Sequence, residues 1–100
     1  MNELEKNKYK EYRKAVFSLI TDIEKEVWKE ILKTSIEYYE HWDHALALDD
    51  ILSNLNIERI NISNEIIHHI QKISSKFQPD GIYFREETLE LFNEIYVVKN

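Results

Sequence analysis

The sequence predicts an all-α fold, a single-domain compact bundle of about five short helices that spans residues 1–100. Only one glycine, Gly81, and one proline, Pro79, occur in the chain, so nearly every segment lacks the residues that interrupt helices. Hydrophobic residues make up 43% of the chain, which is enough for a core even though 32% of the residues are charged. A chain of 100 residues is the size of one domain.

The first helix is expected over about residues 2 to 20 and the second over about residues 22 to 40. Thr21 and Glu24 have the spacing of a capping box, which places the break between these helices near Ile20. The second helix has two adjacent apolar stripes, and a face of that width predicts that it lies at the centre of the bundle. The apolar positions with helical spacing are Tyr9, Tyr12, Val16, Leu19 and Ile23, followed by Val27, Trp28, Ile31, Leu32, Ile36, Tyr38 and Tyr39.

The third helix is expected over about residues 42 to 55 and the fourth over about residues 64 to 77. The sequence NIERINIS between them has the irregular pattern of a short extended connector, and its last residue, Ser63, is a suitable N-cap. The helical spacing predicts that Asp43, Asp49, Asp50 and Asn54 lie mostly outside. The core positions are expected at Ala45, Leu48, Leu52 and Leu55, and at Ile66, Ile70, Ile73 and Phe77.

The fifth helix is expected over about residues 85 to 97, after a turn formed by the sequence PDG. Glu86 and Glu87 fall in its first turn, where the helix dipole favours carboxylates. Between the turn and this helix, an aromatic segment is expected to fold back onto the core. The residues expected in the core here are Tyr83, Phe84, Leu89, Phe92 and Tyr96.

Several classes of catalytic site are excluded by residue counts. The chain contains no cysteine, which excludes disulfides, thiolate nucleophiles and thiolate zinc sites, and its single glycine excludes a glycine-rich phosphate loop. No serine lies in a nucleophile-elbow context, so we expect no catalytic residue and no enzyme.

No apolar run approaches the ~18 residues of a membrane span, and the charged amino terminus is unlike a secretory signal. A soluble, cytoplasmic protein without membrane contact is expected.

The formal net charge of −6 indicates the class of partner. An acidic protein repels the phosphate backbone of nucleic acids, so nucleic-acid binding is not expected. The same charge attracts basic proteins and speeds their association. The composition therefore favours a basic protein partner.

The acidic and aromatic stretch EYYEHWDHALALDD, which starts at Glu37, contains one possible metal site. On a continuous helix, Glu37, His41 and His44 would occupy positions i, i+4 and i+7 and could bind one ion. A helix boundary expected between Glu40 and Trp42 would separate these side chains and leave exposed histidines near a helix end. No metal and no other cofactor is therefore expected.

Pairs of adjacent polar residues do not form a site either. Neighbouring residues on a helix point about 100° apart, so two of them cannot converge on one ion or one substrate. We interpret these pairs as exposed polar residues or as charges at helix ends. They are His68 with His69, Asp49 with Asp50, and Glu86 with Glu87.

The stretch does combine aromatic residues with carboxylates. Aromatic side chains supply the buried anchors of protein interfaces, and surrounding carboxylates steer a basic partner. Trp42 is expected to lie in the core at the corner between the second and third helices. The sequence leaves open whether Tyr38 or Tyr39 is exposed. The candidate partner-binding residues are Glu37, Tyr38, Tyr39, Glu40, Asp43, Asp49 and Asp50.

A pattern of core and cap residues extends from Tyr38 to Ile66, which is under a third of the chain. It consists of Glu40, His41, Trp42, Ala45, Leu46, Leu52, Leu55, Ile60, Asn61, Ile62, Ser63, Glu65 and Ile66. The pattern resembles that of small all-helical bacterial immunity proteins of the MafI type, which belong to contact-dependent or secreted toxin systems. The sequence departs from that pattern at Glu40 and His41, where the family has a glycine.

This resemblance implies that the protein binds a cognate bacterial toxin and neutralises it by stoichiometric occlusion. Many such toxins are nucleases, so it implies a basic nuclease domain as the partner, bound through a variable surface. The alternative function, of a different class, is that of a helical scaffold or homo-oligomerisation module. In the immunity reading the free protein is a monomer or a weak dimer, whereas in the alternative a second subunit is buried by Tyr9, Tyr12, Trp28 and Tyr39.

Overall fold

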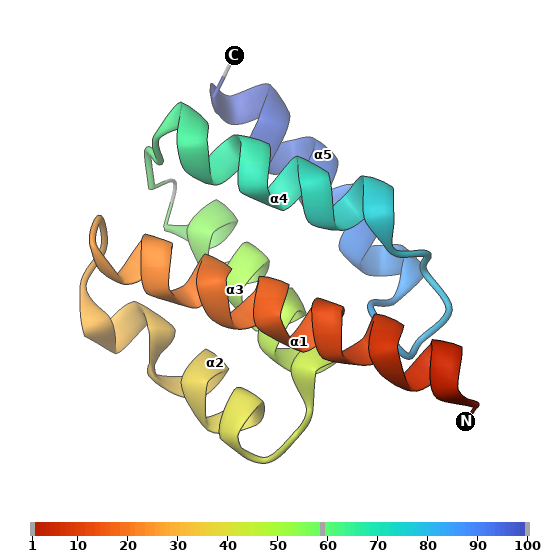
Figure 1. Ribbon diagram of the computed structural model, residues 1–100. Helices are drawn as coiled ribbons and strands as arrows, with labels where there is room; N and C mark the ends of the chain where they lie inside the picture. Colours follow the sequence, from red (N-terminus) through yellow and green to blue (C-terminus); the bar gives the residue numbers. More distant parts are fainter. Residues whose placement is uncertain (1, 59, 100) are drawn as a thin grey trace.

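Five helices follow one another in the computed structural model, which describes the backbone of residues 2–58 and 60–99 and the side chains of residues 2–58 and 60–94 (Figure 1). They are α1 (Glu3–Glu24), α2 (Lys29–Glu40), α3 (His44–Ile57), α4 (Asn64–Lys76) and α5 (Glu86–Lys99). Their radius of gyration is 12.8 Å, close to the ~13 Å of a compact domain of this length. The prediction of an all-α, compact bundle of five helices is confirmed.

Helix α3 lies at the centre of the bundle and contacts α1, α2 and α5. In Figure 1 it passes behind α1, with α2 on one side and α5 on the other. The prediction that the second helix is central is wrong, because α2 buries only Leu32 and Ser35 and leaves its second apolar stripe at the edge of the core. Helix α3 instead buries His44, Ala47, Leu48, Ile51, Leu52 and Leu55.

Helix α1 is longer than predicted and continues through the expected break near Ile20 to Glu24. Thr21 does not cap a new helix; its hydroxyl donates to the carbonyl oxygen of Phe17, 2.9 Å away and one turn earlier. The capping-box spacing also occurs inside helices. The pattern of burial shows that α1 is one continuous helix here and that no new helix starts at Thr21. The buried residues of α1 follow one face across the expected break: Tyr12, Val16, Leu19, Ile20 and Ile23.

Residues 25–28 form the turn between α1 and α2, and they end at the N-cap position of α2, which Trp28 occupies. The placement of Trp28 on a buried stripe is wrong, because its side chain is 79% exposed. The apolar stripe was predicted on a helix that begins at about residue 22, whereas α2 begins only after Trp28. Only the later positions of the stripe reach the core, where Leu32 is fully buried and Ile36 and Tyr39 are partly buried.

The connector between α3 and α4 lies beside this turn. Ser63 accepts the Ile66 N–H at 3.4 Å and so caps α4, as predicted. Its own N–H and hydroxyl donate to the two carboxylate oxygens of Glu26, at 2.9 and 2.7 Å. These bonds join the two connectors at one end of the bundle.

The predicted turn between α4 and α5 is also present. Gly81 has a φ of +82°, a left-handed conformation that glycine adopts without strain. The Asp80 carboxylate accepts the N–H groups of Ile82 and Tyr83 at 2.9 and 3.2 Å. The buried Tyr12 hydroxyl donates to the carbonyl oxygen of Tyr83, which holds the aromatic segment onto the core. Phe84 and Phe92 are buried as expected, whereas the Tyr96 side chain lies outside the described residues.

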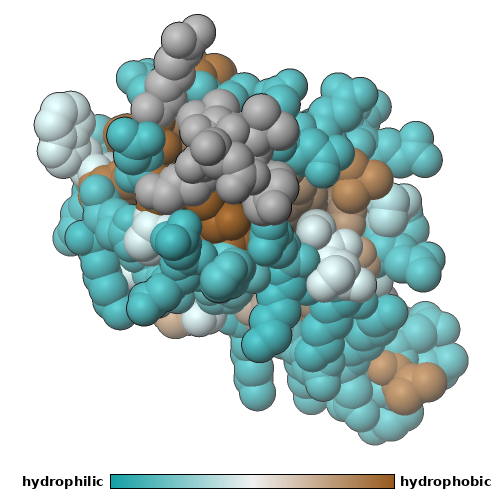
Figure 2. All heavy atoms as spheres, turned by 90° about the horizontal axis from the view of Figure 1, so that it is seen from above, coloured by the Kyte–Doolittle hydropathy of each residue, from teal (hydrophilic) through white to brown (hydrophobic). Residues whose placement is uncertain are grey.

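The face of the molecule that carries α4 and α5 is mainly polar (Figure 2). Figure 2 looks down on the side of α4 and α5, where hydrophilic side chains cover most of the visible face and hydrophobic ones appear in small separate areas. Within the described part of the chain, no helix has both the length and the hydropathy to cross a bilayer.

Candidate partner-binding surface

The corner between α2 and α3 consists of residues 41–43. Helix α2 ends at Glu40, so the predicted boundary between Glu40 and Trp42 is confirmed. The chain turns through two hydrogen bonds, from the Trp42 N–H to the Tyr39 carbonyl oxygen at 3.1 Å and from the Asp43 N–H to the Tyr38 carbonyl oxygen at 2.9 Å. The Asp43 carboxylate then accepts the N–H of Leu46 at 3.3 Å and caps α3.

Trp42 occupies an unusual place in this corner. Its φ is +64°, and among the described residues it is the one non-glycine residue with a positive φ. A left-handed conformation costs a residue with a Cβ about 1–2 kcal/mol. The side chain is 61% exposed, so the prediction that Trp42 lies in the core is wrong. The inner position at this corner belongs to His44, whose side chain is 1% exposed.

An arginine from α1 covers one face of the exposed tryptophan. The guanidinium carbon of Arg13 lies 3.7 Å from the centroid of the Trp42 ring, a cation–π contact. Tyr39 joins the pair, because its hydroxyl donates to the Arg13 carbonyl oxygen at 3.4 Å. The Tyr39 ring also packs 5.8 Å from the ring of Phe17, which is 56% exposed. Within the described residues, Nε of Arg13 is buried without a hydrogen-bond partner.

We call the corner surface the set of side chains that surround this contact: Arg13, Phe17, Tyr39, Glu40, Trp42 and Asp43. It brings together residues of α1, of the end of α2 and of the corner. Glu40 and Asp43 are exposed at positions close to Trp42 in the chain. The corner surface thus combines exposed aromatic side chains with one cation and two anions.

His44 forms the floor of the corner surface. Its Nδ1 atom lies 2.7 Å from the Tyr9 hydroxyl, and its ring packs against Tyr39 and Trp42 with centroids 4.8 and 5.6 Å apart. Burial and the nearby Arg13 cation lower the pKa of His44, and the Asp43 carboxylate opposes them in part. The expectation of an exposed histidine is therefore wrong for His44.

The possible metal site does not assemble. Glu37 and His41 are exposed, whereas His44 points into the core. Among the described residues, no group of three potential ligands lies close enough to hold an ion. The helix boundary separates these side chains, as the sequence indicated.

Asp49 and Asp50 are partly buried and bonded to neighbouring helices, so their predicted place on the outside is wrong. Asp49 accepts the buried Thr88 hydroxyl at 2.9 Å and forms a 2.9 Å ion pair with Arg85, which ties α3 to α5. Asp50 accepts the hydroxyl of buried Ser35 at 2.7 Å and thereby ties α3 to α2. Both carboxylates stabilise helix packing and lie outside the corner surface.

The other predicted candidates divide between two places. Tyr39, Glu40 and Asp43 lie in the corner surface, and Tyr38 is half-buried next to it. Glu37 instead lines a separate shallow hollow on the outer side of α2, with Lys29, Glu30, Lys33 and Ile36.

Three residues of the corner surface were missing from the sequence-based set: Arg13, Phe17 and Trp42. Phe17 lies one position off the apolar stripe of α1, which indicates an apolar side chain outside the core. Trp42 lies in a three-residue connection without glycine, so the left-handed position of this corner falls on a residue with a Cβ. No local signal in the sequence indicates that Arg13 covers Trp42.

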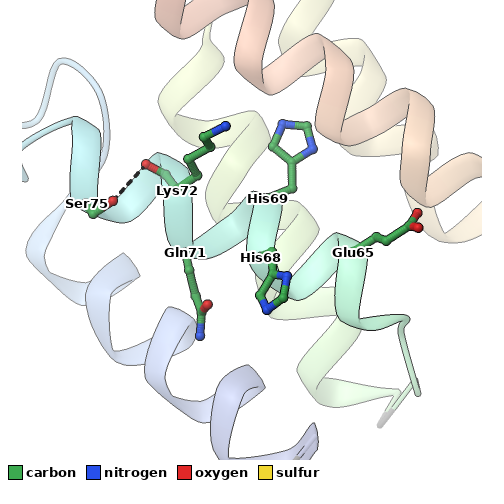
Figure 3. A pocket seen from close by; sticks show the side chains of 6 residues that line it. All are labelled: Glu65, His68, His69, Gln71, Lys72 and Ser75. Carbon is green, nitrogen blue, oxygen red and sulfur yellow. Dashed lines mark hydrogen bonds between the residues drawn. The ribbon is translucent and has the colours of Figure 1, made fainter.

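A hollow on α4 offers no comparable site. Its lining residues all come from this one helix, so nothing encloses a bound molecule from the other side (Figure 3). His68 and His69 point in different directions, as the sequence predicted, and His69 Nδ1 lies 3.3 Å from the Asp22 carboxylate of α1. The lining residues are Glu65, His68, His69, Gln71, Lys72 and Ser75.

The chain was compared with protein-family models, with curated proteins and with solved structures, and none of them matches it. The resemblance of the segment Tyr38–Ile66 to immunity proteins stays a prediction.

Proposed function

We propose that this protein is an immunity protein that binds a cognate bacterial toxin and blocks it by stoichiometric occlusion. The observation that carries this proposal is Trp42, exposed, left-handed and covered by Arg13. Tryptophan, tyrosine and arginine are the residue types that most often dominate binding energy at protein interfaces. The corner surface contains one of each within a few ångströms.

The cost of this arrangement to stability supports a role in binding. A left-handed tryptophan costs about 1–2 kcal/mol, and a cation–π contact at an exposed site returns only about 0.5–1 kcal/mol. The exposed ring gains little from burial in the free protein. Strained and exposed features of this kind concentrate at sites where function needs them.

The charge of the protein favours a basic partner, such as a nuclease domain that holds a polyanionic substrate. The net charge of −6 speeds the approach of such a domain, and the exposed carboxylates of Glu40 and Asp43 lie where it would dock. Trp42 and Phe17 would then fill apolar pockets on the toxin, and this desolvated contact would keep the complex together. Inhibition of this kind takes place in the cytoplasm, where the toxin acts.

Co-expression with a toxin domain encoded by a neighbouring gene tests the proposal. Cells that produce both proteins should grow, and the two proteins should co-purify in a 1:1 complex. Trp42→Ala should lose a large part of the affinity, measured by calorimetry, because it removes the central aromatic anchor. Trp28→Ala is the control, since Trp28 is even more exposed, at 79% against 61% for Trp42, and lies at the other end of α2. Unrelieved toxicity, or equal loss of affinity in both variants, would contradict the proposal.

Most of the residues that a homo-oligomerisation module would use for contact are not available at the surface. Tyr12 is fully buried, and Tyr9 is half-buried with its hydroxyl against His44. Tyr39 is also partly buried. Of the four aromatic residues expected to bury a second subunit, only Trp28 is freely exposed.

A further inference from the structure

The His44 ring supports the corner surface from inside. It is 1% exposed, and its centroid lies 4.8 Å from that of Tyr39 and 5.6 Å from that of Trp42. Its Nδ1 atom lies 2.7 Å from the hydroxyl oxygen of Tyr9. Two aromatic rings of the corner surface therefore rest on the one type of side chain whose charge ordinarily changes close to neutral pH.

Three features of this place oppose a positive charge on the ring. Burial removes the water that would solvate an imidazolium. His44 is also the first residue of α3, and the N-terminal end of a helix carries partial positive charge. In addition, the Arg13 guanidinium lies against the same indole that His44 supports. The Asp43 carboxylate acts in the opposite direction, but it already caps α3 by accepting the N–H of Leu46.

The titratable and charged groups near the ring come from two helices and the corner. They are Tyr9, Tyr12 and Arg13 of α1, Tyr39 of α2 and Asp43 of the corner. Arginine keeps its charge throughout the range in which proteins are folded. Burial raises the pKa of Tyr9 and of Tyr12 above the ordinary value for tyrosine, so both hydroxyls stay neutral. Within this cluster, imidazole is the group whose ordinary pKa lies closest to neutral pH.

The corner is also the part of the fold that yields most easily. Trp42 has a φ of +64°, and a strained backbone relaxes when the corner opens. The cation–π contact that holds its exposed indole is a weak interaction. Segments with few buried contacts open before the whole domain unfolds. Helix α3 stays attached to the core through its other buried residues, which are Ala47, Leu48, Ile51, Leu52 and Leu55.

We propose that His44 is a proton switch of the corner surface. While its ring is neutral, Tyr39, Trp42 and Arg13 remain assembled above it. When the ring takes up a proton, the imidazolium moves outward to water, the contact between Arg13 and Trp42 breaks, and the five helices stay folded. One consequence rests on the function proposed above: the toxin is bound at neutral pH and released in mild acid.

Acrylamide quenching of Trp42 fluorescence tests the switch in the free protein. Trp28→Phe leaves Trp42 as the only tryptophan, and Trp28 lies at the other end of α2. Quenching should become more efficient as the pH falls from about 7.5 to about 5.5, across the ordinary pKa of histidine. At the lower pH it should approach the efficiency measured after a further Arg13→Ala substitution, which uncovers the indole at every pH. Far-UV circular dichroism should stay constant over this range.

Substitution of His44 in the same Trp28→Phe background shows whether this residue is responsible. His44→Asn should give the same quenching at both pH values. His41→Asn, at an exposed residue of the same corner, should keep the pH dependence. The proposal is overturned by quenching that does not change with pH, by a change that His44→Asn retains, or by a parallel loss of helical signal.

Binding measurements separate the switch from the proposed function. The affinity for a toxin domain encoded by a neighbouring gene should fall with pH, by at most about tenfold per pH unit for one proton. His44→Asn should weaken this dependence, and an equal dependence in both proteins would refute control of binding by His44. A protein that shows the quenching change but binds no toxin at either pH would contradict the proposed function and leave the switch in place.

Discussion

The guanidinium of Arg13, on α1, lies 3.7 Å from the ring centroid of Trp42, in the corner between α2 and α3. This contact holds an exposed indole in one orientation before any partner arrives. Side chains that are fixed in advance lose less conformational entropy on binding. The pair therefore combines a strained backbone with an ordered anchor.

Substitutions of Trp42 should separate backbone strain from the role in binding. Trp42→Gly should be more stable than Trp42→Ala by about 1 kcal/mol, because glycine adopts the left-handed conformation without a Cβ penalty. Both variants lack the indole, so both should bind the toxin weakly. Urea unfolding of the two variants measures the difference. Equal stability would show that the corner relaxes to an ordinary conformation once the ring is removed.

Stability should decrease in mild acid because of His44. Burial and the Arg13 cation lower its pKa in the folded state below the ordinary value of 6.5, so the unfolded chain binds more protons in this range. The free energy of unfolding should therefore fall as the pH drops below about 6.5, by at most about 1.4 kcal/mol per pH unit for one group. Above this pH, His44 is neutral in the folded and in the unfolded chain, and this loss of stability is absent. The titratable or charged groups near the His44 ring are Tyr9, Tyr12, Tyr39, Arg13 and Asp43.

His44→Asn isolates this effect, since the asparagine amide can replace Nδ1 beside the Tyr9 hydroxyl. The variant is expected to be less stable at neutral pH and to depend less on pH than the wild type. His41→Asn is the control, because His41 is exposed on the same corner. Urea titrations between about pH 7.5 and about pH 5.5 make the comparison. A pH profile that His44→Asn leaves unchanged would assign the acid sensitivity to other groups.

Asp50 should matter for stability and not for partner binding. Asp50→Ala removes the acceptor of the Ser35 hydroxyl, whose residue is fully buried, and the unsatisfied hydroxyl should cost about 1–3 kcal/mol. The double variant Ser35→Ala with Asp50→Ala should recover part of this loss, because no buried polar group is left without a partner. Glu40→Ala, at an exposed carboxylate, should leave stability nearly unchanged. Chemical denaturation of the wild type, Asp50→Ala, the double variant and Glu40→Ala measures these differences.

Tyr12 should be sensitive to the loss of one oxygen atom. Tyr12→Phe keeps the buried ring but removes the hydroxyl that donates to the Tyr83 carbonyl, so it should cost about 1–2 kcal/mol. Tyr38→Phe is the comparison, since no hydrogen bond of the Tyr38 hydroxyl occurs within the described residues. Thermal unfolding should show a lower midpoint for the first variant only. Similar midpoints would mean that the aromatic segment before α5 is held by its rings alone.

Periodicity predicted the fold because it records which face of a helix is buried. The positions Ile66, Ile70 and Ile73 were assigned to the core and are buried. The N-cap at Ser63 and the PDG turn depend on local chemistry and were also predicted correctly. The break near Ile20 was wrong, because a capping-box spacing cannot show whether the core continues on both sides of it.

The candidate site was predicted less well, because a surface is made by residues distant in sequence. Tyr39, Glu40 and Asp43 were found, but Arg13 comes from another helix, and its contact with Trp42 depends on how α1 crosses the corner. Asp49 was placed outside because a carboxylate is usually solvated. Its partners Arg85 and Thr88 lie about forty residues further along the chain, and only the tertiary structure brings them to it.

Helix α5 packs on α3 and α4, while α2 lies on the opposite side of α3 (Figure 1). Trp42 follows α2, so α5 lies on the far side of α3 from the corner surface. An affinity tag or a fluorescent fusion joined after α5 should therefore hold the protein on a chip with the corner surface open. Attachment there lets toxin capture be measured on immobilised protein.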